Sequence, residues 1–168
     1  MRIVLLALLA GALSTLKQQT VNLTLPSGVH VSIIEAPFRG SGIAMRGCTK
    51  SATVCLVGGK PYGLATGLPR TYIREIVATY RGSKFVLDST GIYDAEATEH
   101  AHHSDVRFFG GSCQDAKNCA FRAVLGDAAN ATAAEWIVID GIVQRTVLSG
   151  ASDIVQFFEK NIDPPTYE

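Results

Sequence analysis

The sequence predicts an α+β domain that is mostly β, an antiparallel sheet or sandwich built from hairpins with one C-terminal amphipathic helix. Three observations predict this class. Apolar and polar residues alternate over many short stretches, Gly-containing turns separate these stretches, and apolar residues recur at helical spacing only near the C-terminus. With 168 residues, 47% of them hydrophobic, the chain suits one domain with one core.

A first hairpin is predicted near the N-terminus. Residues 21–25 and 29–33 alternate in polarity on either side of Pro26-Ser27-Gly28, a typical turn sequence. The following stretch, Ala36 to Gly67, is rich in Gly and has one short apolar run, 53–57. We interpret it as loops around one strand.

A second hairpin is predicted from Tyr72 to Leu87, because β-branched and aromatic residues flank the turn Arg81-Gly82-Ser83. The stretch Ser89 to Ser104 then has no pattern. A strand is predicted over 106–109, ended by a break at Gly110-Gly111, and another over 120–125.

The strongest turn signal is Asp140-Gly141, which suits the two positive-φ positions of a type I′ hairpin. The strands 136–139 and 142–148 then place Trp136 opposite Arg145 and Val138 opposite Val143. This pairing predicts cross-strand packing, with the guanidinium stacked on the indole if the pair is exposed.

One helix is predicted to follow this hairpin. Ser149 is the expected N-cap, Asp153 places negative charge near the helix start, and Pro164-Pro165 ends the segment. The apolar face is expected to consist of residues three or four positions apart, namely Ile154, Phe157, Phe158 and Ile162.

The N-terminus has the layout of a secretory signal peptide. An apolar run, Ile3 to Leu13, follows Met1-Arg2 and contains the small residues Ala10-Gly11-Ala12. The alternative is a buried first strand or helix. We expect residues 1–12 to be a signal peptide, residues 13–168 to be the mature domain in the periplasm or secreted, and no membrane span beyond the leader.

The four cysteines are expected to form disulfides in such an oxidising compartment. The short spacings favour the local pairs Cys48–Cys55 and Cys113–Cys119, each stabilising the domain by about 2 to 3 kcal/mol. A four-thiolate zinc site is the alternative, but the cysteines of such sites usually lie two to four residues apart.

A histidine cluster, His100, His102 and His103, is the only group of residues that invites chemistry. Neutral imidazole is the commonest protein ligand of zinc and copper, and Asp94 and Asp105 flank the cluster. We interpret the segment first as a solvated surface loop, with a metal site as the alternative and acid–base catalysis as the third interpretation. The sequence predicts no other cofactor.

The charge balance and the absence of catalytic motifs argue against several classes of function. Fifteen basic residues balance fifteen acidic ones without a basic cluster, which argues against nucleic-acid binding. Neither a nucleophile elbow nor a phosphate-binding loop occurs, so no catalytic residue is assigned. We expect a non-catalytic protein that binds a protein partner, such as an inhibitor or immunity protein that neutralises a secreted toxin or enzyme. The alternative is a metal-binding protein or a metal-dependent hydrolase using the histidines.

Two loop aromatics, Phe38 and Tyr93, are the candidate anchors for such a partner, because aromatic side chains on long loops often carry interface energy. The alternative is that either ring fills the core.

Overall fold

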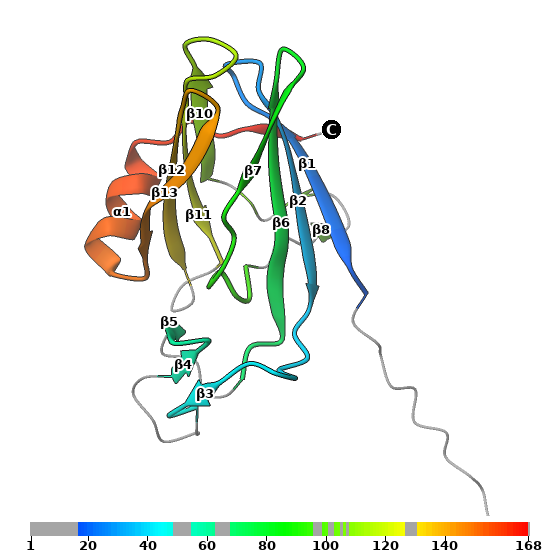
Figure 1. Cartoon of the computed structure of the whole chain (residues 1–168), viewed down its shortest axis with the longest axis vertical. Coiled ribbons are helices and arrows are strands. Elements are labelled where there is room, and N and C mark those ends of the chain that lie inside the picture. Colours follow the sequence, from blue (N-terminus) through cyan, green and yellow to red (C-terminus); the bar gives the residue numbers. More distant parts are fainter. Residues whose placement is uncertain are drawn as a thin grey trace, which may run out of the picture.

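Two antiparallel sheets packed face to face form the body of the molecule, as the computed structural model in Figure 1 shows. The structure describes residues 17–48, 55–62, 68–95, 99–100, 103–104, 106, 108–126 and 131–167. The first sheet has the order β14 (Thr166–Tyr167), β1 (Gln19–Thr24), β2 (His30–Pro37), β6 (Thr71–Tyr80) and β7 (Ser83–Leu87). The second has the order β10 (Phe108–Cys113), β11 (Cys119–Leu125), β12 (Thr132–Ile139) and β13 (Ile142–Ser149).

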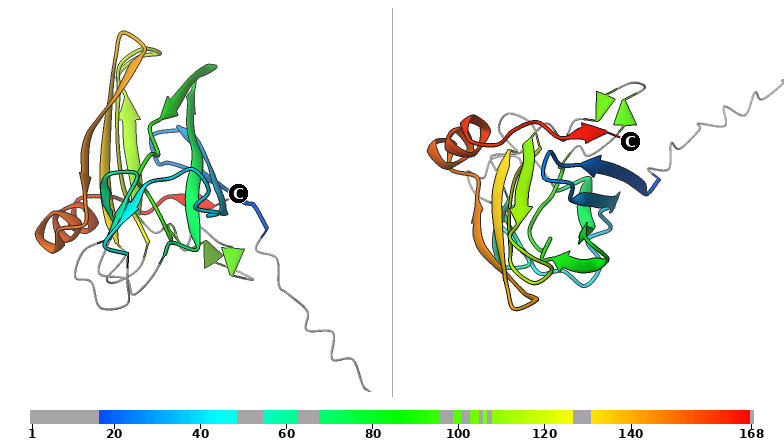
Figure 2. Two further views of the ribbon diagram at one scale, coloured as in Figure 1. Left: turned by 60° about the horizontal axis from the view of Figure 1, so that its bottom comes forward. Right: turned by 90° about the horizontal axis from the view of Figure 1, so that it is seen from above.

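The remaining elements are short. A small sheet contains β3 (Met45–Arg46), β4 (Cys55–Val57) and β5 (Lys60–Tyr62), and β8 (Glu99–His100) pairs with β9 (His103–Ser104). The single helix of the described chain, α1 (Ser152–Lys160), covers the outer face of the second sheet (Figure 2). The fold is therefore the predicted α+β class, mostly β and antiparallel, with one C-terminal helix.

The core lies between the two sheets and follows the predicted alternation. On β1 and β2, Leu23, Val31 and Ile33 are buried, while the residues between them are more exposed. Trp136 of β12 is fully buried and stacks on Phe109 of β10, with ring centroids 6.2 Å apart. Burying a side chain of this size stabilises the sandwich by several kcal/mol.

The three predicted hairpins are present. Asp140 and Gly141 have φ values of 52° and 81°, as a type I′ turn requires. The expected pairs Trp136 with Arg145 and Val138 with Val143 are also in register. The Trp136 indole is buried, however, and the Arg145 guanidinium donates its hydrogen bonds elsewhere, as described below.

The predicted break at Gly110-Gly111 is wrong, because β10 runs through both glycines to Cys113. A Cβ atom on Gly111 would lie 2.4 Å from the Ala120 carbonyl oxygen, and one on Gly110 would lie 2.9 Å from Cγ2 of Ile162. These glycines permit close packing within a strand rather than ending it.

The predicted helix start is also wrong. Ser149 still belongs to β13, Ala151 is the N-cap residue, and the Ser149 hydroxyl accepts a hydrogen bond from the Ala151 backbone amide at 3.1 Å. Val155 and Phe158 form the buried face of α1, and Ile162 is buried just beyond the end of the helix, whereas Phe157 is 54% exposed. At 100° a residue, Phe157 lies about 200° around the helix from Val155, so it points away from the sheet.

Three other predictions concern segments described only in part. The stretch 36–67 contains β3 and β5 in addition to the expected strand, and the patternless stretch 89–104 contains the short β8 and β9. Residues 1–12, the expected signal peptide, lie outside the described residues. Among the described segments, no helix is long and apolar enough to cross a membrane.

Candidate functional site

The two ends of the sandwich are built differently (Figure 1). At one end, which we call the hairpin end, short turns join β1 to β2, β6 to β7, β10 to β11 and β12 to β13. At the other, which we call the loop end, the chain leaves β2 for the small sheet, enters β6 and continues beyond β7. The residues predicted to contact a partner lie at the loop end.

Phe38 and Tyr93 meet there although they are far apart in sequence. Their ring centroids lie 5.6 Å apart in an edge-on arrangement, and Phe38 contacts Tyr72 in the same way at 6.4 Å. Tyr72 also forms an isolated backbone bridge with Tyr93. The two stretches that lacked a sequence pattern are thus brought together at one place.

A small apolar cluster holds these rings in position. Phe38 and Tyr93 are half-buried and pack against Cys55 and Val57 of β4, beside the disulfide partner Cys48. Both rings therefore contribute to packing while part of each remains accessible. Burial raises the pKa of the Tyr93 hydroxyl, because the phenolate is disfavoured away from water.

A hollow of about 540 Å³ opens beside the cluster, a volume typical of ligand sites. Its walls come from the end of β2 and the segment after it, from the start of β6, and from residues 89–93. The side chains relevant to binding are Phe38, Arg39, Ile43, Tyr72, Arg74 and Tyr93, and no lining residue carries a carboxylate.

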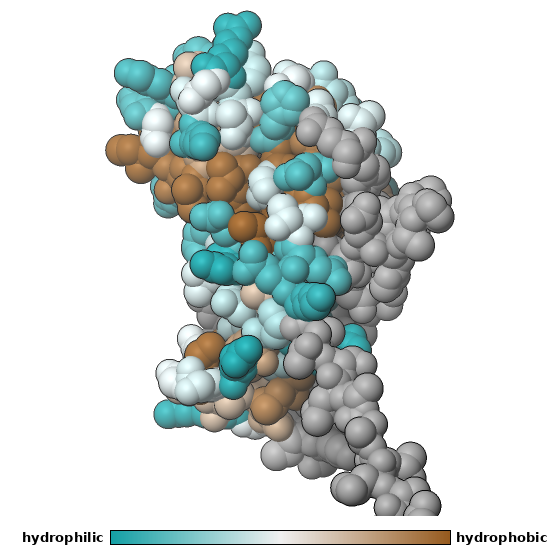
Figure 3. All heavy atoms as spheres, turned by 90° about the vertical axis from the view of Figure 1, so that its right-hand side faces the viewer, coloured by the Kyte–Doolittle hydropathy of each residue, from teal (hydrophilic) through white to brown (hydrophobic). Residues whose placement is uncertain are grey.

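Apolar side chains reach the surface at this end. Ile43 is 37% exposed and Met45 is 38% exposed. Figure 3 shows apolar surface at the loop end, separated by hydrophilic side chains from a second apolar area higher on the same face. Partly exposed apolar groups around a hollow are a common feature of protein-binding surfaces.

Two buried carboxylates fix the loop that carries Tyr93, and sequence reasoning missed them as a pair. Asp94 accepts hydrogen bonds from the backbone amides of Arg70 and Thr71, both at 2.8 Å. The Thr71 hydroxyl contacts Asp94 and also donates to Glu35. Asp94 and Glu35 are 5% and 2% exposed, and no sequence spacing relates residues 35, 71 and 94. These contacts join β2, the start of β6 and the loop after β7.

Arg145 fixes the same loop from the second sheet. Its guanidinium donates to the carbonyl oxygens of Asp88 and Thr90 and forms an ion pair with the Asp88 carboxylate at 3.1 Å. The Trp136 indole N–H donates to the same Asp88 carbonyl at 3.0 Å. The predicted Trp136–Arg145 pair therefore holds the loop through hydrogen bonds rather than by stacking.

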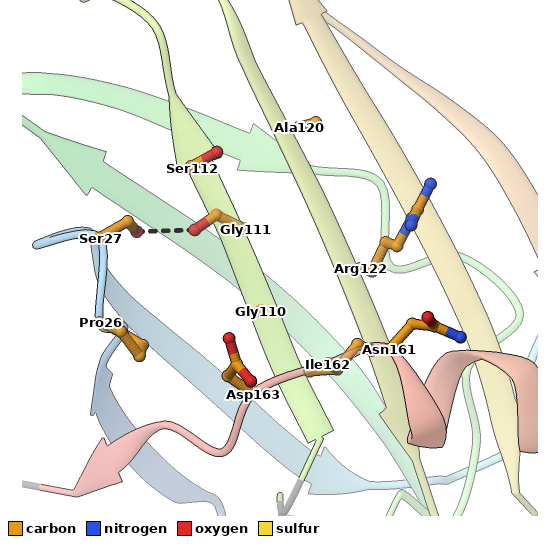
Figure 4. A pocket seen from close by; sticks show the side chains of 10 residues that line it. All are labelled: Pro26, Ser27, Gly110, Gly111, Ser112, Ala120, Arg122, Asn161, Ile162 and Asp163. Atoms are coloured by element: carbon orange, nitrogen blue, oxygen red, sulfur yellow. Dashed lines mark hydrogen bonds between the residues drawn. The ribbon is translucent and has the colours of Figure 1, made fainter.

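A second hollow, of about 610 Å³, lies on the outer face of the second sheet (Figure 4). Its floor is formed by small residues of β10 and β11, and its rim includes Ser27, which donates to the Gly111 carbonyl at 2.6 Å. The close packing described above accounts for the glycines of this floor. They do not require a ligand.

The charges at the rim of the second hollow are Arg122 and Asp163. The Arg122 guanidinium is paired with Glu135 and lies 5.6 Å from the centre of the Phe158 ring. Burial alone would raise the pKa of Glu135, but hydrogen bonds from Arg122 and Thr146 and the charge of Arg122 lower it below its usual value. Arg122 is thus committed to holding α1 against the sheet.

The structure forms both local disulfides, Cys48–Cys55 and Cys113–Cys119, and no cysteine is free. Two disulfides are consistent with an oxidising extracellular or periplasmic location.

The histidine cluster remains a prediction. His100 and His103 are cross-strand partners in β8 and β9, but their side chains and the whole of His102 lie outside the described residues. Among the side chains that are described, no group of three or more His, Cys, Asp or Glu is arranged to hold a metal ion.

Comparison with protein-family models, curated proteins and solved structures finds no match to this chain.

Proposed function

We propose that this chain is an exported, non-catalytic binding protein, an inhibitor or immunity protein that neutralises a secreted toxin or enzyme. In this proposal the hollow at the loop end is the contact site. The observation that carries it is the meeting of two patternless loops around Phe38 and Tyr93, next to a hollow with partly exposed apolar side chains.

The way these loops are fixed supports binding. The Cys48–Cys55 disulfide, the Asp94 hydrogen bonds and the Arg145 hydrogen bonds constrain the surface before any partner arrives. Ordering loops on association costs free energy, so a preformed surface retains more of its contact energy as affinity. A scaffold that presents rigid loops suits stoichiometric inhibition.

The test is inhibition of a secreted enzyme or toxin from the native host. The partner is captured with the tagged, disulfide-intact protein, and its activity is measured with increasing protein. Activity is expected to fall to a plateau at a fixed stoichiometry. Ile43→Asp should weaken inhibition by at least about tenfold, because it places a charge in the apolar contact.

Val86→Asp is the matched control, because Val86 is 62% exposed on β7, outside the lining of the hollow. It should inhibit like the unmodified protein. The proposal is wrong if Ile43→Asp inhibits equally well. It is also wrong if no partner is found and the purified protein itself turns over a substrate in a hydrolase screen.

A further inference from the structure

Two arginine side chains give the hollow at the loop end a positive charge. Arg39 and Arg74 line it and are both exposed. Arg74 donates one hydrogen bond to the Gln18 side chain at 2.8 Å, and Arg39 forms no hydrogen bond or ion pair within the described chain. Guanidinium groups with spare donors are suited to bind carboxylates in a bidentate manner.

The acidic groups near the hollow do not cancel this charge at the surface. Glu35 and Asp94 are buried and hydrogen-bonded to Thr71, and Asp94 also binds the backbone amide of Arg70. The Asp88 carboxylate is paired with Arg145. The accessible charge on the described lining of the hollow is therefore positive.

The hollow also has an apolar wall. Phe38, Tyr72 and Tyr93 form an aromatic wall, and the partly exposed Ile43 extends it. Ser41 and Ser89 add hydroxyl groups to the same hollow, which can bond a peptide backbone. Ligand pockets are typically lined by apolar and aromatic side chains with a few polar groups, so this lining suits a bulky apolar group.

We propose that this hollow binds an acidic peptide segment of the partner, with one bulky apolar side chain against the aromatic wall and flanking carboxylates on Arg39 and Arg74. The inference rests on the proposed function and adds the chemistry of the partner to it. Charge complementarity of this kind speeds association and excludes basic competitors.

The probe is a random peptide library displayed on phage and selected on the full, disulfide-intact protein. Selected peptides should be enriched in Asp and Glu around a Phe, Trp, Leu or Ile. A synthetic copy of the most enriched peptide should bind less tightly at higher salt, because screening weakens exposed charge pairs.

The variant Arg39→Glu/Arg74→Glu should weaken binding of this peptide by at least about tenfold. The control Arg81→Glu/Lys84→Glu makes the same charge change at exposed positions of the hairpin end and should leave affinity within about twofold. Circular dichroism of both variants checks that the fold is retained.

The inference is overturned if selection yields basic or uncharged peptides, if it yields none, or if the Arg39/Arg74 variant binds the acidic peptide normally. These outcomes differ from failure of the proposed function. If acidic peptides bind but no inhibited partner is found, the proposed ligand chemistry is supported and the proposed inhibitor function is rejected. If the Arg39/Arg74 variant inhibits a partner as well as the unmodified protein does, the inhibitor function is supported and the proposed ligand chemistry is rejected.

Discussion

The hairpin end and the loop end of the sandwich keep their shape by different means. Within its turns, the hairpin end relies on contacts between residues close in sequence, as where Asp115 accepts hydrogen bonds from the backbone amides of Lys117 and Asn118. Other hydrogen bonds join separate turns, such as that from the Gly141 amide to the Lys117 carbonyl at 2.9 Å. The loop end relies on contacts between distant residues, such as Phe38 with Tyr93 and Arg145 with Thr90.

This difference distinguishes the framework of the sandwich from the candidate site at the loop end. A tight turn satisfies most of its own backbone hydrogen bonds, whereas long loops must be held by partners elsewhere in the chain. Substituting a residue that fixes these loops should therefore make the loop end more mobile while the sandwich stays folded.

Removing each disulfide separately should have the largest effect on stability and should show the difference between the two ends. Cys48→Ser/Cys55→Ser and Cys113→Ser/Cys119→Ser should each lower the free energy of unfolding by about 2 to 3 kcal/mol in urea titrations, since the closed loops are similar in length.

The local response should differ between the two variants. Loss of Cys48–Cys55 should open the segments around β3 and β4 to limited proteolysis under native conditions, because these strands are only two and three residues long. Loss of Cys113–Cys119 should not expose the β10–β11 turn, which the Asp115 hydrogen bonds and strand pairing still close. Equal protection of both segments would contradict the comparison.

The sequence predicted the hairpin end better than the loop end, because local sequence patterns determine turns but not contacts between distant segments. Local patterns such as Asp140-Gly141 determine a turn, and they correctly placed Trp136 opposite Arg145. The bonds from Arg145 to residues 88 and 90, and the link between Glu35 and Asp94 through Thr71, join distant segments and have no local signal.

Loop aromatics were a partial guide to the site, since Phe38 and Tyr93 do line the hollow but also fill a small cluster. Two local predictions failed because tertiary contacts overrode them. Packing against Ile162 and Ala120 explains Gly110 and Gly111 within a strand, and extension of β13 moved the helix cap past Ser149.

Arg145→Gln should have the next largest effect, a loss of about 2 kcal/mol in unfolding free energy, because hydrogen bonds from a charged donor are lost at a side chain only 9% exposed. Amide hydrogen exchange should become faster at residues 88–93. Arg81→Gln changes an exposed position at the hairpin end, where the guanidinium lies 5.1 Å from the centre of the Tyr80 ring; it should cost no more than about 1 kcal/mol and leave exchange at residues 88–93 unchanged. Unchanged exchange in Arg145→Gln would show that Arg145 does not fix the loop.

The smallest expected effect is on pH dependence, and it has opposite signs at the two ends. The Tyr93 pKa is raised above its ordinary 10.0 by burial, so the unfolded chain loses this proton first. The corresponding stability is present below about pH 10 and is lost as the pH rises through the folded pKa. Thermal melts of Tyr93→Phe should show a shallower alkaline decline.

Asp115 gives the acid counterpart. The Asn118 side chain and the backbone amides of Lys117 and Asn118 lower its pKa below the ordinary 3.8. Its contribution is present above that value and is lost as the pH falls through the folded pKa. Asp115→Asn should flatten the acid limb and leave the alkaline limb unchanged. A change in the same limb for both variants would contradict this assignment.

The pairing of β14 with β1 has a consequence for folding kinetics. The Thr166 hydroxyl donates to the Thr24 carbonyl across 142 residues of chain, and β14 is the outer neighbour of β1 in the first sheet. β14 covers only Leu23 and Thr24 of this edge, so during synthesis this part of the β1 backbone stays open until almost all of the domain has emerged. Such an edge can pair with other chains. Aggregation during production should depend on how quickly residues 162–167 reach β1, a rate that equilibrium stability does not measure.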